Sequence, residues 1–214
     1  MSPGLWRAPL PAVLAAALAL GCSGLPPPMV GDPGPELSDA RANAEYNALV
    51  DHFSAQKQVF HGFETICFAG VTYESSAFVT ARIRRRDAFQ AQPPAQLAKD
   101  LQEAQADAAQ FYDFTLGAYI QDPRFDDLAY PTSIWRVMLA TPAGEVAPVS
   151  VKRIGRADVN TRAYYPYMGD FWTVYRVRFP RSVDSRPVLP PELKTFTVVL
   201  ASSLGRAEFP LPTE

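Results

Sequence analysis

The chain has 214 residues, with 20 Lys or Arg against 22 Asp or Glu, which gives a formal net charge of −2 at pH 7. This near-neutral balance argues against broad binding to nucleic acid, because such binding needs a clear excess of basic side chains. The chain is long enough to bury one hydrophobic core of ordinary domain size.

The first residues have the features of a secretory leader. An apolar run from Leu10 to Leu20 ends at Gly21-Cys22-Ser23. Its length fits the roughly 7–15 residue core of a signal peptide, and it is shorter than the roughly 20 residues that span a bilayer. A small residue directly before a cysteine resembles the lipobox of bacterial lipoproteins. The resemblance implies acylation of Cys22, and the alternative is ordinary cleavage near it.

Acylation of Cys22 would make the membrane a partner of this protein. Each buried methylene adds about 0.8 kcal/mol, so more than one acyl chain attaches a protein stably. Ser23 follows the cysteine, and the sorting rule of enterobacterial lipoproteins then implies the outer membrane. We expect a lipid-anchored protein of the cell envelope that faces the periplasm or the cell surface.

A segment rich in proline and glycine follows the cysteine, from Leu25 to Pro35. Such a segment favours extended polyproline geometry and cannot build a core. We therefore expect a leader over residues 1–21, a lipidated cysteine and tether over residues 22–36, and one globular domain over residues 37–214.

Two stretches have the apolar spacing of amphipathic helices. Residues 38–61 carry apolar side chains three or four apart, and Gly62 follows as a C-terminal signal. Residues 93–120 begin with proline and place an apolar stripe opposite Lys, Asp, Glu and Gln. We expect both helices to pack on a sheet by one face.

The rest of the chain is typical of antiparallel strands. Residues 77–84 alternate between apolar and polar side chains, Pro142-Ala143-Gly144 is a hairpin turn, and Pro148 marks an edge or a bulge. The expected strands are Phe63–Tyr73, Ala77–Arg84, Ser133–Thr141, Glu145–Ile154, Phe171–Phe179, Thr195–Ala201 and Arg206–Leu211. We expect an α+β fold, with an antiparallel β-sheet or β-sandwich and two amphipathic helices packed on it.

Two groups of side chains are candidates for binding a partner. Tyr164, Tyr165 and Tyr167 belong to the densest aromatic stretch of the chain and precede an expected strand. Aromatic rings with hydroxyls in a loop suit a glycan or a peptide. The second group is three arginines that would point to one face at the end of the expected strand 77–84: Arg82, Arg84 and Arg86. That row could bind phosphate, or it could instead protect a sheet edge.

Other residues offer weaker chemistry. His52 and His61 are nine positions apart and would not share a helix face. Asp122, Asp126 and Asp127 are dense enough for calcium, but their spacing differs from that of an EF-hand, and a solvated loop is the alternative that we favour. Cys67 would be the one cysteine left beside Cys22, and we expect a small buried apolar side chain there.

The sequence contains no Walker A loop, Rossmann glycine pattern, HExxH, paired CxxC or nucleophile elbow. We therefore expect no cofactor and no metal. Our first hypothesis is a non-enzymatic lipoprotein that binds an envelope protein or glycan, or that has a structural role there. The alternative is an envelope hydrolase that uses Asp126 or Asp127 as acid or base.

Overall fold

The computed structural model describes residues 40–214. The leader, Cys22 and the tether lie outside the described residues, so the expectations for them stay predictions. The helices and strands are α1 (Ala40–Phe53), β1 (Ser54–His61), β2 (Glu64–Tyr73), α2 (Ser76–Gln90), α3 (Pro94–Gln110), β3 (Phe111–Ile120), η1, a 3₁₀ turn (Pro123–Phe125), β4 (Arg136–Thr141), β5 (Gly144–Val146), β6 (Ser150–Arg156), α4 (Val159–Tyr164), β7 (Thr173–Pro180), β8 (Ser182–Val183), β9 (Arg186–Pro187), β10 (Thr195–Ser202) and β11 (Gly205–Pro212).

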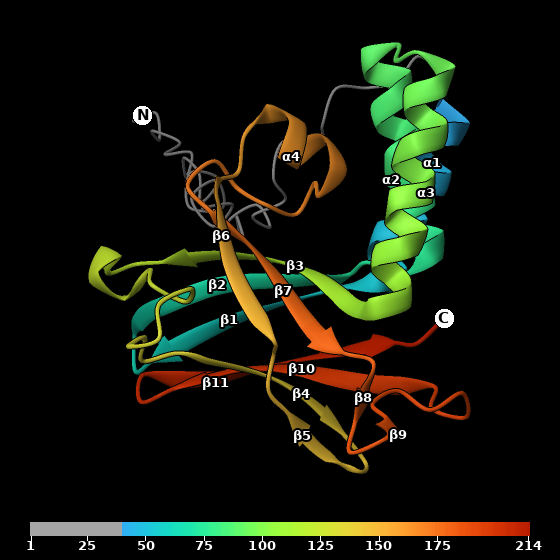
Figure 1. The fold of residues 1–214 in the computed structure, drawn as a ribbon. Coiled ribbons are helices and arrows are strands. Elements are labelled where there is room, and N and C mark those ends of the chain that lie inside the picture. The colour runs from blue at the N-terminus through green and yellow to red at the C-terminus, as the bar shows by residue number, and fades with distance from the viewer. Residues whose placement is uncertain (1–39) are drawn as a thin grey trace, which may run out of the picture.

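The strands form two main antiparallel sheets that face each other (Figure 1). Sheet A has the order β1-β2-β3-β7-β6, and sheet B has the order β11-β10-β4-β5. Strands β8 and β9 pair as a separate short ribbon. Helix α4 lies on the side of sheet A away from sheet B, and α2 and α3 rise from one end of the sheet. The predicted α+β class is confirmed.

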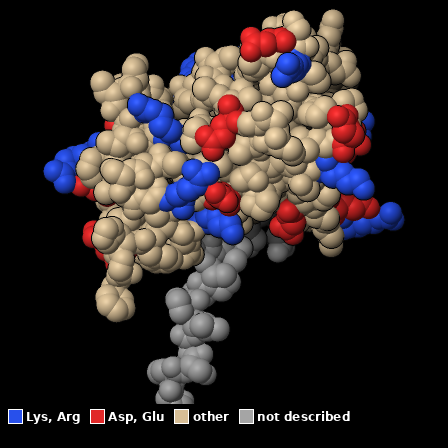
Figure 2. Space-filling model, turned by 90° about the horizontal axis from the view of Figure 1, so that it is seen from below, with Lys and Arg blue, Asp and Glu red and all other residues tan. Residues whose placement is uncertain are grey.

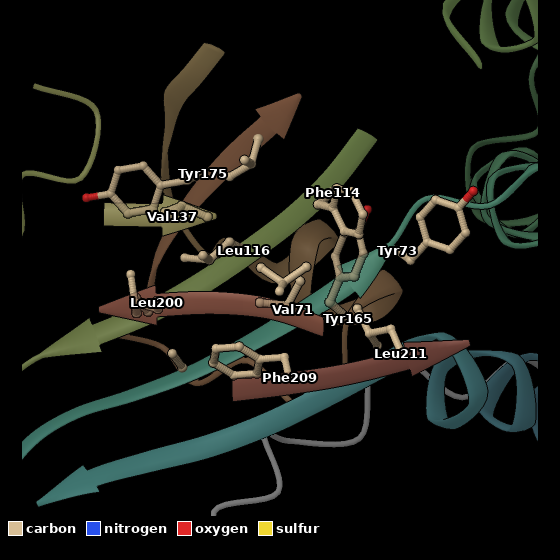
Figure 3. Close-up of a cluster of buried hydrophobic side chains, with 14 of the residues drawn as sticks. Val71, Tyr73, Phe114, Leu116, Val137, Tyr165, Tyr175, Leu200, Phe209 and Leu211 are labelled. Atoms are coloured by element: carbon tan, nitrogen blue, oxygen red, sulfur yellow. The ribbon is translucent and has the colours of Figure 1, made fainter. Parts of the chain in front are cut away.

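The core lies between the two sheets. Alternate residues of β2 and β3 point inward, among them Val71, Phe114 and Leu116, and they meet Leu200 and Phe209 of sheet B (Figure 3). Each of these side chains is at most 1% exposed. Burying a side chain of this size contributes about 1.5–3 kcal/mol, so the alternation in the strands is what holds the two sheets together.

The two sheets also meet along their edges. Strand β1, at the edge of sheet A, lies beside β11, at the edge of sheet B. At the opposite side the chain passes from β5 in sheet B to β6 in sheet A. The single strand predicted for Glu145–Ile154 is therefore wrong, because Pro148 lies where the chain leaves one sheet for the other.

The first predicted helix is too long. Helix α1 ends at Phe53, and Ser54–His61 continues as β1, paired with β2 from Ser54↔Thr72 to His61↔Glu64. Gly62 has a φ of 61° and belongs to the hairpin turn after β1 rather than to a helix end. Phe60, which fitted the helical stripe, is 53% exposed. Tertiary pairing with β2 overrides the local helical spacing here.

The predicted strand Ala77–Arg84 is helical. It lies within α2, whose N-cap Ser75 accepts a hydrogen bond from the backbone N–H of Phe78 at 3.2 Å. Phe78 and Ile83 of α2 are buried. The alternation between apolar and polar residues gave the wrong period. Ser75, which the prediction did not use, is a residue type that favours a helix start.

The second predicted helix combines a helix with a strand. Helix α3 ends at Gln110, and Phe111–Ile120 is β3, the central strand of sheet A. Its residues alternate between inward side chains, such as Phe114, and outward ones, such as Thr115. A helical stripe from α3 runs into this segment by coincidence of spacing. The predicted strands at Phe63–Tyr73, Phe171–Phe179, Thr195–Ala201 and Arg206–Leu211 are confirmed within about three residues at each end.

Candidate functional site

The outer face of sheet A, which turns away from sheet B, carries polar side chains. Thr72, Asp113 and Thr115 alternate there with the inward apolar residues of β2 and β3, and Arg176 and Arg178 do so on β7. Thr72 is 0% exposed and Asp113 is 9% exposed. Buried polar groups need partners, so the elements that cover this face determine its chemistry.

The three tyrosines lie in the segment that covers the middle of this face. Tyr164, Tyr165 and Tyr167 are 8%, 6% and 5% exposed. The expectation that all three lie in a loop is wrong for Tyr164, which ends α4, and none of the three rings is exposed for stacking on a glycan or a peptide. Their rings fit because the sheet is bare below them: a Cβ added at Gly70 would lie 2.5 Å from the Tyr167 ring.

Two tyrosine hydroxyls, one of this segment and one of α1, form hydrogen bonds inside the fold. Tyr167 Oη lies 2.7 Å from Thr72 Oγ1, and Tyr46 Oη donates to the carbonyl oxygen of Tyr164 at 2.8 Å. Burial raises the pKa of Tyr167 and of Tyr46. Both phenols therefore stay protonated and serve as neutral hydrogen-bonding groups.

The three candidate arginines do not form a row, because they lie on helix α2 rather than on a strand. Arg82 and Arg86 are one turn apart, and Arg84 is exposed on another side of the helix. Arg82 Nε donates to Glu74 at 3.2 Å, and Arg86 forms an ion pair with Asp100 of α3. Both interpretations of the row, as a phosphate site and as protection for a sheet edge, assumed a strand and are therefore wrong.

Arg85 is the buried member of this run and was not a candidate. Its guanidinium donates to the carbonyl oxygen of Ala163 at 3.0 Å and to Asn43 Oδ1 at 2.8 Å. It also lies 4.4 Å from the centre of the Tyr46 ring. Arg85 therefore ties α2 to α1 and α4, and its role is structural.

An open cleft of about 580 Å³ lies between the α2–α3 pair, the outer face of sheet A and α4. We call it the helix–sheet cleft. Its volume is within the range of about 300–1,000 Å³ that is usual for small-ligand sites. Residues from α2, α3, β3, β6, α4 and β7 line it, so it collects side chains that are far apart in the sequence.

A buried polar cluster forms the floor of the cleft. Glu74, whose side chain is 7% exposed, pairs with Arg82 and accepts hydrogen bonds from Thr115 Oγ1 at 2.7 Å and Tyr165 Oη at 2.5 Å. We call these four residues the Glu74 cluster. Burial, followed by the Glu74 charge, raises the pKa of Tyr165 well above its usual value. Tyr165 therefore donates its proton to the carboxylate and keeps it.

A second set of ion pairs holds the end of α3 against the sheet. Asp113 accepts from Arg178 Nε at 2.9 Å and from Arg176 at 2.7 Å. Asp107 of α3 accepts from Arg176 at 2.9 Å and from Arg178 at 2.7 Å. Since two carboxylates face two guanidiniums, this wall of the cleft is close to neutral and fixes the spacing between α3 and β7.

Two polar atoms in the lining of the cleft have no hydrogen-bond partner. They are Nε of Arg86 and Oη of Tyr164, and both are shielded from solvent. A donor left in this condition costs about 1–3 kcal/mol, so these atoms need an explanation. The other cleft residues near them, such as Asp158, have internal partners: its carboxylate caps α4 by accepting from Thr161 N at 2.7 Å, and this bond keeps its pKa low.

The aspartates of the predicted loop have structural contacts. Asp126 accepts from Thr173 Oγ1 and Tyr175 Oη, each at 2.7 Å. Asp127 accepts from Ser133 Oγ at 2.7 Å. Asp122 is bound by Arg124, whose hydrogen bonds keep its pKa low. Neither Asp126 nor Asp127 lines the helix–sheet cleft, so the cleft and the aspartates proposed for hydrolysis are separate.

The histidines do not come together. His52 Nε2 lies 2.9 Å from the backbone oxygen of Glu214, whereas His61 lies at the end of β1. Among residues 40–214, no group of three or more His, Cys, Asp or Glu side chains is placed to hold a metal ion. Within the same residues, no helix is long and apolar enough to cross a membrane.

Cys67 is 0% exposed, as expected, and burial raises the pKa of its thiol to about 11. We expect the folded mature chain, with Cys22→Ser, to resist a chromogenic disulfide reagent at about pH 8, because only an accessible thiolate reacts. One thiol should react promptly in denaturant. Prompt reaction in native buffer would contradict the burial of Cys67.

The charged residues on the outer side of sheet B, away from sheet A, do not mark a second site. Figure 2 shows Lys and Arg interspersed with Asp and Glu over the described part of this face. The ion pairs of Arg206 with Glu145 and Glu208 belong to sheet B. Exposed pairs of this kind contribute about 0–1 kcal/mol.

Comparison with known proteins adds no relative: no family model, no curated protein and no solved structure matches this chain.

Proposed function

We propose that this protein is a lipid-anchored lipoprotein of the bacterial cell envelope whose folded domain binds a ligand in the helix–sheet cleft without changing it chemically. The observation that carries the binding role is the cleft itself, about 580 Å³ in volume and lined from six separate elements. The anchor is carried by the Gly21-Cys22 junction and the apolar run before it.

The polar groups of the cleft favour binding over catalysis. Glu74 is held by three donors, and Asp107 and Asp113 are each held by two arginines. A general acid or base must be able to exchange its proton with a substrate. Carboxylates that are held this firmly are suited to shaping a site.

The hydrolase alternative receives less support. Asp126 is bound by Thr173, Tyr175 and Arg153, and these contacts attach η1 and the residues after it to β7. Such contacts explain the aspartate without a substrate. We therefore retain a binding role as the proposal.

The anchor is tested by the intact mass of the mature protein purified from membranes. We expect the mass of residues 22–214 plus acyl chains, and we expect Cys22→Ser to lose both the added mass and the membrane association. An unmodified mass in a soluble fraction would reject the anchor but would leave the cleft proposal open.

The cleft is tested by filling it. Ala104 of α3 lines the cleft, whereas Ala106 of the same helix is exposed and does not. We expect Ala104→Trp to lower ligand binding at least about tenfold, because a pocket filled by an indole excludes other groups. Ala106→Trp should bind as the parent chain does.

The measurement is native mass spectrometry of the mature chain with Cys22→Ser. Two probes are used, a total lipid extract of bacterial envelopes and soluble peptidoglycan fragments. Circular dichroism checks that both tryptophan variants are folded. The proposal requires an adduct with at least one probe, and it fails if no adduct forms or if Ala104→Trp retains the adduct as fully as Ala106→Trp.

A further inference from the structure

The part of the helix–sheet cleft formed by α2 and α4 contains donors that the protein itself does not use. Arg86 Nε and Tyr164 Oη are both shielded from solvent without a partner. Tyr164 is 8% exposed as a residue. Arg86 uses another nitrogen for Asp100, and Arg82 uses Nε for Glu74. The unpartnered atoms come from α2 and α4, two helices that contact each other and both line the cleft.

Three guanidiniums act on the Tyr164 hydroxyl. Burial raises the pKa of this phenol, whereas Arg86, Arg82 and Arg85 act to lower it. Arg82 and Arg86 are each paired with one carboxylate, Glu74 and Asp100, so the free Nε of Arg86 and not an excess of charge is what a ligand would use. Guanidinium and phenol donors together suit an oxyanion such as a carboxylate or a phosphate.

The α3 side of the cleft carries apolar residues between the acidic residues Asp100, Glu103 and Asp107, and it is only partly covered. Leu101, Ala104 and Ala108 line it, and none of the residues of α3 is buried. Ile83 of α2 and Val174 of β7 continue the apolar lining. A helix normally buries its apolar stripe against another element, so this wall fits an aliphatic chain that lies along α3.

From these observations we infer that the ligand of the cleft is an amphipathic anion. Its carboxylate or phosphate accepts hydrogen bonds from Arg86 and Tyr164, beside Arg82, and its aliphatic chain lies against Leu101 and Ala104. This inference rests on the proposed function and specifies its ligand class. A fatty acid and a phospholipid share this chemistry.

The first test compares four probes by calorimetric titration of the mature chain with Cys22→Ser. The probes are dodecanoate, dodecyl phosphate, the neutral dodecyl maltoside and inorganic phosphate. We expect the two amphipathic anions to bind at least about tenfold more tightly than the maltoside, since hydrogen bonds to a charged group are stronger than neutral ones. Inorganic phosphate should bind more weakly, because it has no chain. A preference between dodecanoate and dodecyl phosphate assigns the source as fatty acid or phospholipid.

The second test removes single donors. Tyr164→Phe deletes a hydroxyl that has no internal partner, so the fold should not lose stability while the affinity for both anions falls about tenfold. Arg86→Gln combined with Asp100→Asn removes the guanidinium without leaving a carboxylate unpaired, and it should weaken the same probes. Binding of the maltoside should not change in either variant.

The control is Tyr112→Phe, whose hydroxyl donates to the carbonyl oxygen of Leu189 at 3.3 Å outside the cleft. It should bind all probes as the parent chain does. Equal binding of the anions and the maltoside, or unchanged anion binding in Tyr164→Phe, would overturn the amphipathic anion while leaving a cleft that Ala104→Trp still blocks. If the parent chain binds none of the probes, or if Ala104→Trp and Ala106→Trp bind them equally, the proposed function itself is rejected.

Discussion

Glu74→Leu is expected to lower the free energy of unfolding by about 3 kcal/mol, because removing one partner of a buried ion pair leaves the other uncompensated. Glu74 is 7% exposed and Arg82 is 26% exposed at the side chain. The change also removes the acceptor for Thr115 and Tyr165. Since domains are stable by only about 5–15 kcal/mol, this loss is large. Urea unfolding followed by tryptophan fluorescence measures it.

Two further variants separate the buried pair from a general effect of charge. Glu74→Leu combined with Arg82→Leu should recover most of the loss, since replacing both partners of a buried pair is often neutral, and Thr115 and Tyr165 keep their mutual contact at 3.1 Å. Glu103→Leu removes an exposed carboxylate 3.7 Å from Lys99 and should cost less than about 0.5 kcal/mol. If Glu74→Leu lowers the free energy of unfolding as little as Glu103→Leu does, the Glu74 cluster does not stabilise the fold.

The strands β4, β7, β10 and β11 in the second half of the chain could be predicted because their pattern is strictly local. In β7, Val177 and Phe179 alternate with Arg176 and Arg178, and a period of two residues is enough to assign both the strand and its inner face. The fold class followed from several such segments. Nothing in this pattern depended on knowing which strand lies beside β7.

The boundaries in the first half failed for the opposite reason. The segments Ser54–His61 and Phe111–Ile120 follow helices and contain apolar residues that extend the helical spacing by chance. They are strands because β2 pairs with both. The hydrogen bonds that decide between helix and strand come from residues elsewhere in the chain, so a short window cannot weigh them.

The cleft could be predicted only in fragments. Arg82, Arg84 and Arg86 were singled out as one row, but the partners of Arg82 and Arg86, which are Glu74 and Asp100, lie outside α2. Tyr164 was singled out for an exposed ring, whereas the structure makes its unpartnered hydroxyl the relevant group. A useful signal was present in β7 and β3, since Arg176 and Asp113 alternate with core residues and needed a polar partner on the outer face.

Two glycines lie under residues 164–168, which we call the tyrosine segment, and sequence alone did not reveal this pair. Gly70 and Gly117 are partners in the ladder between β2 and β3. A Cβ added at Gly70 would meet the Tyr167 ring, and one added at Gly117 would meet Met168 Cε at 2.8 Å. The absence of two side chains on adjacent strands lets the segment that carries Tyr164 lie directly on the sheet.

Gly70→Ala is expected to lower the free energy of unfolding by about 2–3 kcal/mol, because extra volume in a packed interior forces rigid groups apart. The new methyl group would lie 2.5 Å from Cε2 and 2.8 Å from Cδ2 of Tyr167, and that ring is held in place through Thr72. Thermal unfolding by circular dichroism measures the loss, and fluorescence of Trp172, whose ring lies 6.2 Å from that of Tyr167, reports the displacement.

Gly117→Ala is the matched control, because it adds the same methyl group at the paired position of the next strand. There the two shortest contacts are with the end of the Met168 side chain, which has three rotatable bonds and can move aside, and the third is with Trp172 Cε3 at 3.0 Å. We expect a loss of only about 1 kcal/mol. If both glycine variants lose the same stability, then the rigidity of the tyrosine segment is not what sets the tolerance of this face. The position of Tyr164 in the cleft would then depend on α4 and on the hydrogen bond from Arg85 to Ala163.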